Sequence, residues 1–349
     1  MILNAGLRFE MWNPDSPYWV DIKRLAEMEV KETSTKQKIS PRLGVSYPVS
    51  NIAAFHFAYG HFYQLPTYTL LYQGQRELTD KEDYYWNKEP SWRGNLYYPM
   101  TEMNEFRLAN ANMEPEKTVS YEAGVQTKIT EDISVDITAF YREMSNLVGE
   151  RFVAEAAAGA GLRYADNYDY GNARGVEIVL KKRYSNYFSL SANYTFSKAL
   201  ITSSTPWEQI QLSNPTFRTF VANWDRPHAF SFDLFIGKPN NWGLSLYGNI
   251  QSGLPYSIKV EPNTERMPWL GTVDMRLSKS FQFLGFTETV FLRIMNLLDR
   301  KNIYYVYASS GKPDLPLGID RTARNLNVYD DPSNYGPGRQ VRMGLGINF

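Results

Sequence analysis

Several residue types and patterns are missing from this 349-residue chain. Cysteine is absent, which excludes a disulfide framework and a thiolate metal site. Lysine plus arginine equal aspartate plus glutamate, at 37 each, so the chain has no net field that would recruit nucleic acid. No run of about 18 apolar residues occurs, which excludes a transmembrane helix. Neither a nucleic-acid binder nor a helical membrane protein is indicated.

The common motifs of catalysis and metal binding are missing as well. The sequence contains no G-x-S-x-G, no H-E-x-x-H and no Walker-type loop, and the serines near His56 and His228 have no spacing that favours an outer-membrane hydrolase. His56 and His61 lie in one predicted strand, where an odd separation turns them to opposite sides and prevents shared metal binding. The acidic loop 329–336 lacks the spacing of a calcium loop. We predict no enzymatic activity, no metal and no cofactor.

Aromatic residues, by contrast, are abundant. They make up 15% of the chain, with 25 tyrosines, 19 phenylalanines and eight tryptophans, while the mean hydropathy is −0.44. A polar average combined with many aromatic rings suits a membrane β-barrel, whose lumen and loops are polar and whose aromatic girdles lie at both membrane interfaces.

The last nine residues, "VRMGLGINF", alternate between two kinds of side chain with a period of two, which is the period of a β-strand. One side is wholly apolar and comprises Val341, Met343, Leu345, Ile347 and Phe349. The other side, from Arg342 to Asn348, is polar or bare. Since chain ends are normally frayed and solvated, a terminal strand this regular is predicted to be paired, with its apolar side covered.

The same alternation recurs along the chain and predicts an all-β, antiparallel fold of about twelve strands. The predicted strands lie near residues 1–11, 38–48, 51–64, 119–129, 133–142, 171–183, 190–197, 229–237, 242–253, 271–283, 286–298 and 341–349. Many exceed ten residues, whereas strands of soluble proteins usually have about five or six. That length suits tilted strands crossing an apolar band about 25 Å tall. Segment 18–30 has some helical spacing but falls between strands.

Short and long connections alternate strictly between these strands. The short turns lie at 47–51, 130–132, 183–186, 238–241 and 283–285, and the long connections at about 13–36, 65–115, 149–169, 201–225, 254–270 and 299–337. Transmembrane barrels have short periplasmic turns and long extracellular loops, whereas compact soluble domains rarely need several long loops. Segment 302–309 is then an extracellular extension and not a crossing strand. Alternation alone would also fit a soluble β-sandwich, but the loop asymmetry favours the barrel.

A series of motifs resembles one known family. The segments "ISPRLGVSYPVS" (39–50), "MEPEKTVSYEAGVQ" (113–126), "WDRPHAF" (224–230), "FLRIMNLLDRKN" (291–302) and "GRQVRMGLGINF" (338–349) follow one another over nearly the whole chain. In this order they resemble the C-terminal half of the β-barrel of TonB-dependent outer-membrane receptors.

The resemblance implies a 22-strand barrel around an N-terminal plug, in the outer membrane of a Gram-negative bacterium. Such receptors take up a scarce nutrient with force delivered by the TonB complex. The resemblance also implies outer-membrane lipid, lipopolysaccharide and the barrel assembly machinery as partners, the last reading the strand that ends at Phe349.

No plug, energy-coupling box or signal peptide is visible, and the alternation begins at once, at Leu3. We therefore expect this chain to be part of a longer one, beginning near strand 11. The alternative is a complete small barrel that serves as a passive pore or an adhesin. In that case residues 1–11 would pair with residues 338–349.

The longest predicted loop, 65–115, contains the segment "EDYYWNKEPSWRGNLYYP". Aromatic rings and an arginine in a loop can stack on a small molecule, a sugar or a peptide. The candidate ligand-binding residues are Tyr85, Trp86, Trp92, Arg93 and Trp207. The alternative for each is packing within the loop or anchoring in lipopolysaccharide.

Five arginines fall within predicted strands, namely Arg42, Arg142, Arg174, Arg276 and Arg293. A lipid-facing arginine near the bilayer midplane costs about 2–4 kcal/mol. Those at midplane depth are therefore predicted to face the lumen, within a lattice that includes Glu122, Asp136 and Asp274.

Overall fold

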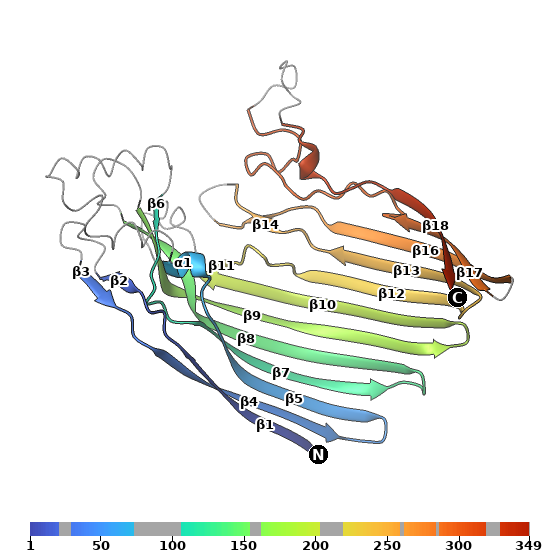
Figure 1. Ribbon diagram of the computed structural model, residues 1–349, viewed down its shortest axis with the longest axis horizontal. Helices are drawn as coiled ribbons and strands as arrows, with labels where there is room; N and C mark the ends of the chain where they lie inside the picture. The colour runs from blue at the N-terminus through green and yellow to red at the C-terminus, as the bar shows by residue number, and fades with distance from the viewer. Residues whose placement is uncertain are drawn as a thin grey trace.

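The computed structural model describes residues 1–20, 29–72, 106–153, 162–202, 219–258, 262–283, 286–318 and 329–348. These residues form one 14-stranded sheet and two small hairpins. Twelve strands run along the sheet in chain order, and each is antiparallel to its neighbours (Figure 1). The predicted fold class and strand number are confirmed.

The bounds of the twelve strands agree with the predicted positions. They are β1 (Ile2–Trp12), β4 (Lys36–Pro48), β5 (Ala53–Gln64), β7 (Glu116–Lys128), β8 (Ile133–Val153), β9 (Leu162–Ser185), β10 (Phe188–Thr202), β12 (His228–Lys238), β13 (Trp242–Gln251), β16 (Leu270–Phe283), β17 (Phe286–Met295) and β18 (Gln340–Asn348). β8 and β9 are longer than expected, because their ladder continues into 149–169. The added part includes Asp166, Asn167 and Asp169, so no apolar alternation marks it in the sequence.

Shorter elements occupy the long connections. They are β2 (Pro17–Val20), β3 (Glu29–Glu32), α1 (Tyr68–Tyr72), β6 (Phe106–Leu108), β11 (Thr219–Val221), β14 (Pro255–Tyr256), β15 (Glu265–Arg266) and the 3₁₀ turn η3 (Pro332–Asn334). Segment 18–30, with its partly helical spacing, has strand structure at both described ends, where β2 pairs with β3. In the described parts of the chain, no helix is both long and apolar enough to span a membrane.

The chain order of antiparallel strands gathers all long connections at one end of the sheet and all short turns at the other (Figure 1). We call these the loop end and the turn end. Both termini lie at the turn end. Residues 302–309 form isolated bridges, from Ile303 to Tyr335 and from Tyr307 to Lys312, at the loop end. As predicted, this segment is not a crossing strand.

The sheet does not close on itself. In the described residues β1 pairs with β4 alone and β18 with β17 alone, so these two strands are its edges. The pairing of 1–11 with 338–349, which the small-barrel alternative predicts, is wrong.

The described chain has little hydrophobic core. Two small clusters of buried apolar residues lie near the loop end: one contains Leu71, Met113 and Ala165, and the other Ala199, Ile201 and Ala222. Large apolar side chains are instead exposed along the strands, with Leu7 at 79% and Met343 at 80% of their full accessibility. No second described sheet covers them, so the described chain does not form a β-sandwich.

Candidate functional site

The register of the twelve strands divides the sheet into two continuous faces. Directly paired residues project to the same side, and the pairing keeps Leu43, Tyr59, Tyr121 and Tyr141 in one row across four strands. We call their side the apolar face. The opposite side is the polar face, which includes Arg42, Ser120, Glu122, Arg142 and Glu177.

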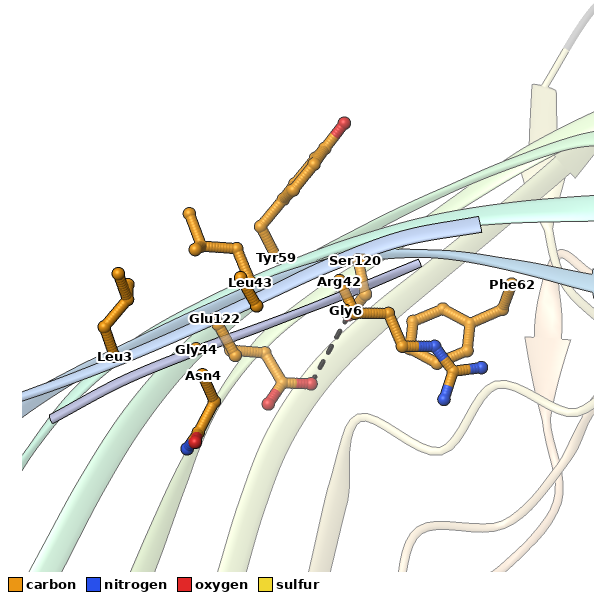
Figure 2. Close-up of a pocket in the computed structure, with 13 residues that line it drawn as sticks. Leu3, Asn4, Gly6, Arg42, Leu43, Gly44, Tyr59, Phe62, Ser120 and Glu122 are labelled. Atoms are coloured by element: carbon orange, nitrogen blue, oxygen red, sulfur yellow. Dashed lines mark hydrogen bonds between the residues drawn. The ribbon is translucent and has the colours of Figure 1, made fainter. Parts of the chain in front are cut away.

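Figure 2 shows both faces near the β1 edge. Leu3, Leu43 and Tyr59 point to one side, while Asn4 and Glu122 point to the other. A hollow of about 580 Å³ has lining residues from both faces. Glycines at positions 6, 44 and 60 line it and leave the sheet thin there. The hollow is therefore a shallow part of the sheet wall and not an enclosed ligand site.

Charged side chains on the polar face make local contacts. Arg142 donates to Glu122 at 3.3 Å, and Asp136 lies 3.4 Å from Nε2 of His56 and accepts from the Thr138 hydroxyl at 2.7 Å. The guanidinium of Arg42 lies over the Phe62 ring, 4.7 Å from its centre. Of the predicted lattice, the described residues therefore contain the Arg142–Glu122 pair, whereas Asp136 and Arg42 have partners other than those predicted.

Arg174 differs from the other strand arginines because it lies on the apolar face, opposite Tyr141 and Lys198. It precedes Ser185, the last residue of β9, by 11 positions. At about 3.3 Å per residue and a tilt of about 40°, it stands roughly 28 Å from the turn end. That height exceeds an apolar band of about 25 Å, so Arg174 is not at midplane depth.

The three histidines lie among aromatic and polar neighbours. His61 is on the apolar face, with Nε2 2.7 Å from the Tyr59 hydroxyl, and His56 is on the polar face, so the predicted opposite orientation is confirmed. His228 lies between the rings of Phe196 and Trp269, and its Nδ1 is 2.8 Å from the Tyr194 hydroxyl.

Aromatic side chains occur at two levels of the apolar face. Toward the loop end, the ring centres of Tyr59 and Tyr121 are 5.2 Å apart and those of Tyr121 and Tyr141 are 6.3 Å apart. Toward the turn end, the exposed rings include Tyr47, Trp242 and Phe281. Two aromatic levels on an exposed apolar face correspond to the girdles of a membrane barrel.

The "MEPEKT" motif connects neighbouring strands at the loop end through polar contacts, and we call such a set of contacts a tie. Glu114 makes ion pairs with Lys36 at 3.0 Å and Lys38 at 2.8 Å, which join it to β4. Burial raises the pKa of Glu114, but hydrogen bonds from the two lysines outweigh burial and lower the pKa below its ordinary value. Glu116 accepts from the backbone N–H of Val148 at 3.0 Å, beside an irregularity in the β8 ladder.

The "WDRPHAF" motif forms a second tie. Asp225 is buried at 2% exposure and accepts from the backbone N–H of Ala199 at 2.7 Å and from Arg266 at 2.8 Å. Arg226 donates to the Ser252 carbonyl at 2.6 Å. The motif therefore joins β10, β12, β13 and β15.

The "NLLDRKN" motif forms a third tie. The backbone N–H of Asn296 donates to Asp274 at 2.9 Å, and its side-chain amide donates to the carbonyls of Arg300 and Pro337. Asn302 exchanges two hydrogen bonds with the backbone of Gly271, at 2.8 and 2.9 Å. Asn296 has a positive φ of 50°, which asparagine tolerates better than most residues. The motif residues thus hold β16, β17 and β18 together.

The residues predicted to bind ligand are not in the described part of the chain. Tyr85, Trp86, Trp92, Arg93 and Trp207 all lie outside the described residues, and their role remains a prediction. Sequence reasoning did not identify Glu114, Asp225 and Asn296 as structural ties, although each lies in a motif that carried the resemblance.

The C-terminal strand has the predicted alternation. Val341, Met343, Leu345 and Ile347 have exposures of 59%, 80%, 60% and 47%, and their register places them on the apolar face. Phe349 lies outside the described residues. The described part of this strand is not packed beneath a second layer of protein.

Comparison with known proteins identifies the family. The family model described as "TonB dependent receptor-like, beta-barrel" matches residues 1–297. This chain belongs to the TonB-dependent receptor family. Its members are barrel proteins of the Gram-negative outer membrane, and that is the location of this chain. A comparison with curated proteins finds no match.

Solved structures of the family share the fold. The ferric-catecholate import receptor Fiu from K12 E. coli aligns with a TM-score of 0.56 at 12% identity, covering 99% of this chain and 42% of the receptor. The FrpB iron transporter from Neisseria meningitidis has a TM-score of 0.57 at 14% identity, covering 98% of this chain and 42% of the transporter. The ferric citrate transporter FecA aligns with a TM-score of 0.56 at 15% identity, covering 99% of this chain and 42% of the transporter. This chain thus spans less than half the length of these receptors.

Proposed function

We propose that this chain forms part of the barrel wall of a receptor that takes up a scarce nutrient by TonB-coupled transport. Membership of the family supports this function, and so does the share of the solved receptors that the chain covers. The observation that carries the proposal is the continuous register of twelve strands, which gives the sheet one mainly polar and one mainly apolar face. Such a wall separates a wet lumen from lipid.

The proposed ligand is an iron chelate, because the three structural neighbours are a ferric-catecholate import receptor, an iron transporter and a ferric citrate transporter. We assign its binding to Tyr85, Trp86, Trp92, Arg93 and Trp207. A guanidinium group suits the anionic oxygens of such a chelate, and aromatic rings can pack on its organic groups. A sugar or a peptide would use the same aromatic residues without Arg93 as a charge partner.

Cellular uptake tests this function. The natural protein is deleted in its host and restored as wild type or as Arg93→Ala, with ⁵⁵Fe supplied as ferric citrate or as a ferric catecholate. We expect deletion or loss of TonB to abolish uptake of one chelate, and R93A to reduce it. Trp224→Phe serves as the control with normal uptake. Uptake that is independent of both the protein and TonB would contradict the proposal.

The loop end is proposed to be extracellular and the turn end periplasmic. These 349 residues contain no cysteine, so a single cysteine introduced into them is their only thiol. Lys312→Cys at the loop end should react with an impermeant maleimide on intact cells, whereas Glu131→Cys at the turn end should react only after permeabilisation. Labelling of E131C alone on intact cells would reverse the orientation.

Lipid and assembly partners are part of the proposal. Arg174 and Lys198 are adjacent on the apolar face at the level of Tyr141, where two cations suit the phosphates of lipopolysaccharide. The strand from Val341 to Phe349 is proposed as the segment read by the barrel assembly machinery. No catalytic step is included, and turnover of phospholipid or peptide esters by purified protein would contradict that part.

A further inference from the structure

Three arginines stand side by side on the polar face. Arg276 of β16 is directly opposite Arg293 of β17, which is directly opposite Arg342 of β18. All three side chains are exposed. Directly opposed residues have Cβ atoms about 4.5–5.5 Å apart, so three guanidinium groups share one short row. We call these residues the arginine row.

Within the described residues, no ion pair neutralises the arginine row. Arg276 lies over the Phe291 ring at 4.7 Å, and Arg342 donates to the neutral Gln340 side chain at 3.3 Å. The nearby carboxylate on this face, Asp274, accepts from the backbone N–H of Asn296 instead. Two other arginines of the polar face, Arg8 and Arg142, do have carboxylate partners within the described chain.

In the part of the chain that the structure describes, the arginine row lacks the carboxylate partners that these other arginines have. Arg8 is 2.8 Å from Glu10, and Arg142 is 3.3 Å from Glu122. Like charges directly opposite each other destabilise a sheet, so a bound anion would offset the repulsion among the three aligned arginines. A guanidinium group offers a planar fork of donors that matches carboxylate and phosphate oxygens.

We propose that the arginine row is a binding site for an oxyanion partner that carries two or more carboxylate or phosphate charges. The site lies on strands β16, β17 and β18 and uses none of the residues assigned to the iron chelate. It goes beyond the proposed function and does not depend on coupled transport. The anion can be a free solute or the acidic side chains of a protein segment, since both present the same oxygens.

Calorimetry on the full chain in zwitterionic detergent tests the site, with pyrophosphate and citrate as free anions and acetate as the monovalent comparison. We expect both polyvalent anions to bind more tightly than acetate. Arg293→Gln removes the central guanidinium and should weaken binding about tenfold, because one charge-assisted hydrogen bond is lost. Arg342→Gln on the edge strand should act in the same direction and guards against a folding defect in one variant.

The matched control is Lys181→Gln, which removes an exposed cation from the same face at a position opposite Ser134 and Ser191. Its affinity should equal that of wild type. A short polyglutamate peptide forms the second arm. If the peptide binds more tightly than citrate, the partner of the arginine row is an acidic protein segment. If citrate binds more tightly, the partner is a free solute. Absence of binding by both, or equal binding by R293Q and wild type, would overturn the proposal.

Discussion

The middle of the sheet and its loop end are stabilised in different ways. In the middle, successive residues simply alternate between the two faces, and side chains such as Val125 and Ile137 remain exposed. At the loop end, polar side chains such as Asp225, Asn296 and Asn302 are buried and hydrogen-bonded to specific backbone groups. The middle depends on its solvent, which is lipid on one side, whereas the loop end depends on particular partners.

The largest expected effect is at Asp225. Asp225→Asn keeps the side-chain volume but leaves Arg266, which is 31% exposed, without its counter-charge. Breaking a fully buried pair costs about 3–5 kcal/mol, and we expect a loss near the lower end of that range. Guanidinium unfolding in detergent, followed by tryptophan fluorescence, measures the loss. The control Asp330→Asn alters an exposed loop carboxylate and should change stability by less than about 0.5 kcal/mol. Equal stability of D225N and wild type would refute the importance of this tie.

The next effect distinguishes the two faces in the middle of the sheet. Ile137→Arg places a charge on the apolar face between Val125 and Ile178, and should destabilise the protein in phospholipid vesicles by about 2–4 kcal/mol. The neighbouring control Gln126→Arg lies on the polar face opposite Asp136 and should be tolerated. Equal losses for I137R and Q126R would remove the distinction between the faces.

A smaller, pH-dependent effect is expected at Glu114. Its pKa is lowered in the folded protein, so its stabilisation is complete above the ordinary value of 4.5 and is lost as the pH falls through the lower folded pKa. Glu114→Gln should lose about 1 kcal/mol at pH 7, a modest value because the group is partly exposed. The difference from wild type should shrink below pH 4.5 in unfolding measurements. A constant difference from pH 7 to pH 3 would contradict this account.

The smallest effect is expected for the exposed pair on the polar face. The side chains of Arg142 and Glu122 are 50% and 36% exposed, and such pairs contribute about 0.2–1 kcal/mol. Arg142→Gln should therefore lower the free energy of unfolding by an amount near the lower limit of that range, and this loss should disappear at high salt. Unfolding measurements at low and high salt check it. A loss comparable to that of D225N would show that this pair is structurally equivalent to the loop-end ties.

The middle of the sheet was predictable because the type of each side chain, polar or apolar, indicates the face on which it lies. Val119, Tyr121 and Val125 follow a period of two, so the strand and its apolar face can be read without knowledge of its neighbours. The strand order also follows from the alternation of short and long connections.

The loop end was not predictable in this way. Glu114 depends on Lys36 and Lys38, which are far away in the sequence, and Asp225 depends on Arg266. Such pairs carry no periodic signal. The arginine row was missed for the same reason, since Arg276, Arg293 and Arg342 become neighbours only through the register of three strands. The ligand-binding residues remain predictions.

One face of the sheet contacts acyl chains, and the other contacts water. Spin labels test this division. A single cysteine is introduced into the natural protein, as Val125→Cys or as the adjacent Gln126→Cys, and is labelled in outer membranes. We expect the label at position 125 to collide mainly with oxygen dissolved in lipid, and the label at position 126 to collide mainly with a water-soluble nickel chelate. Equal collision rates at the two positions, or the reverse order, would contradict it.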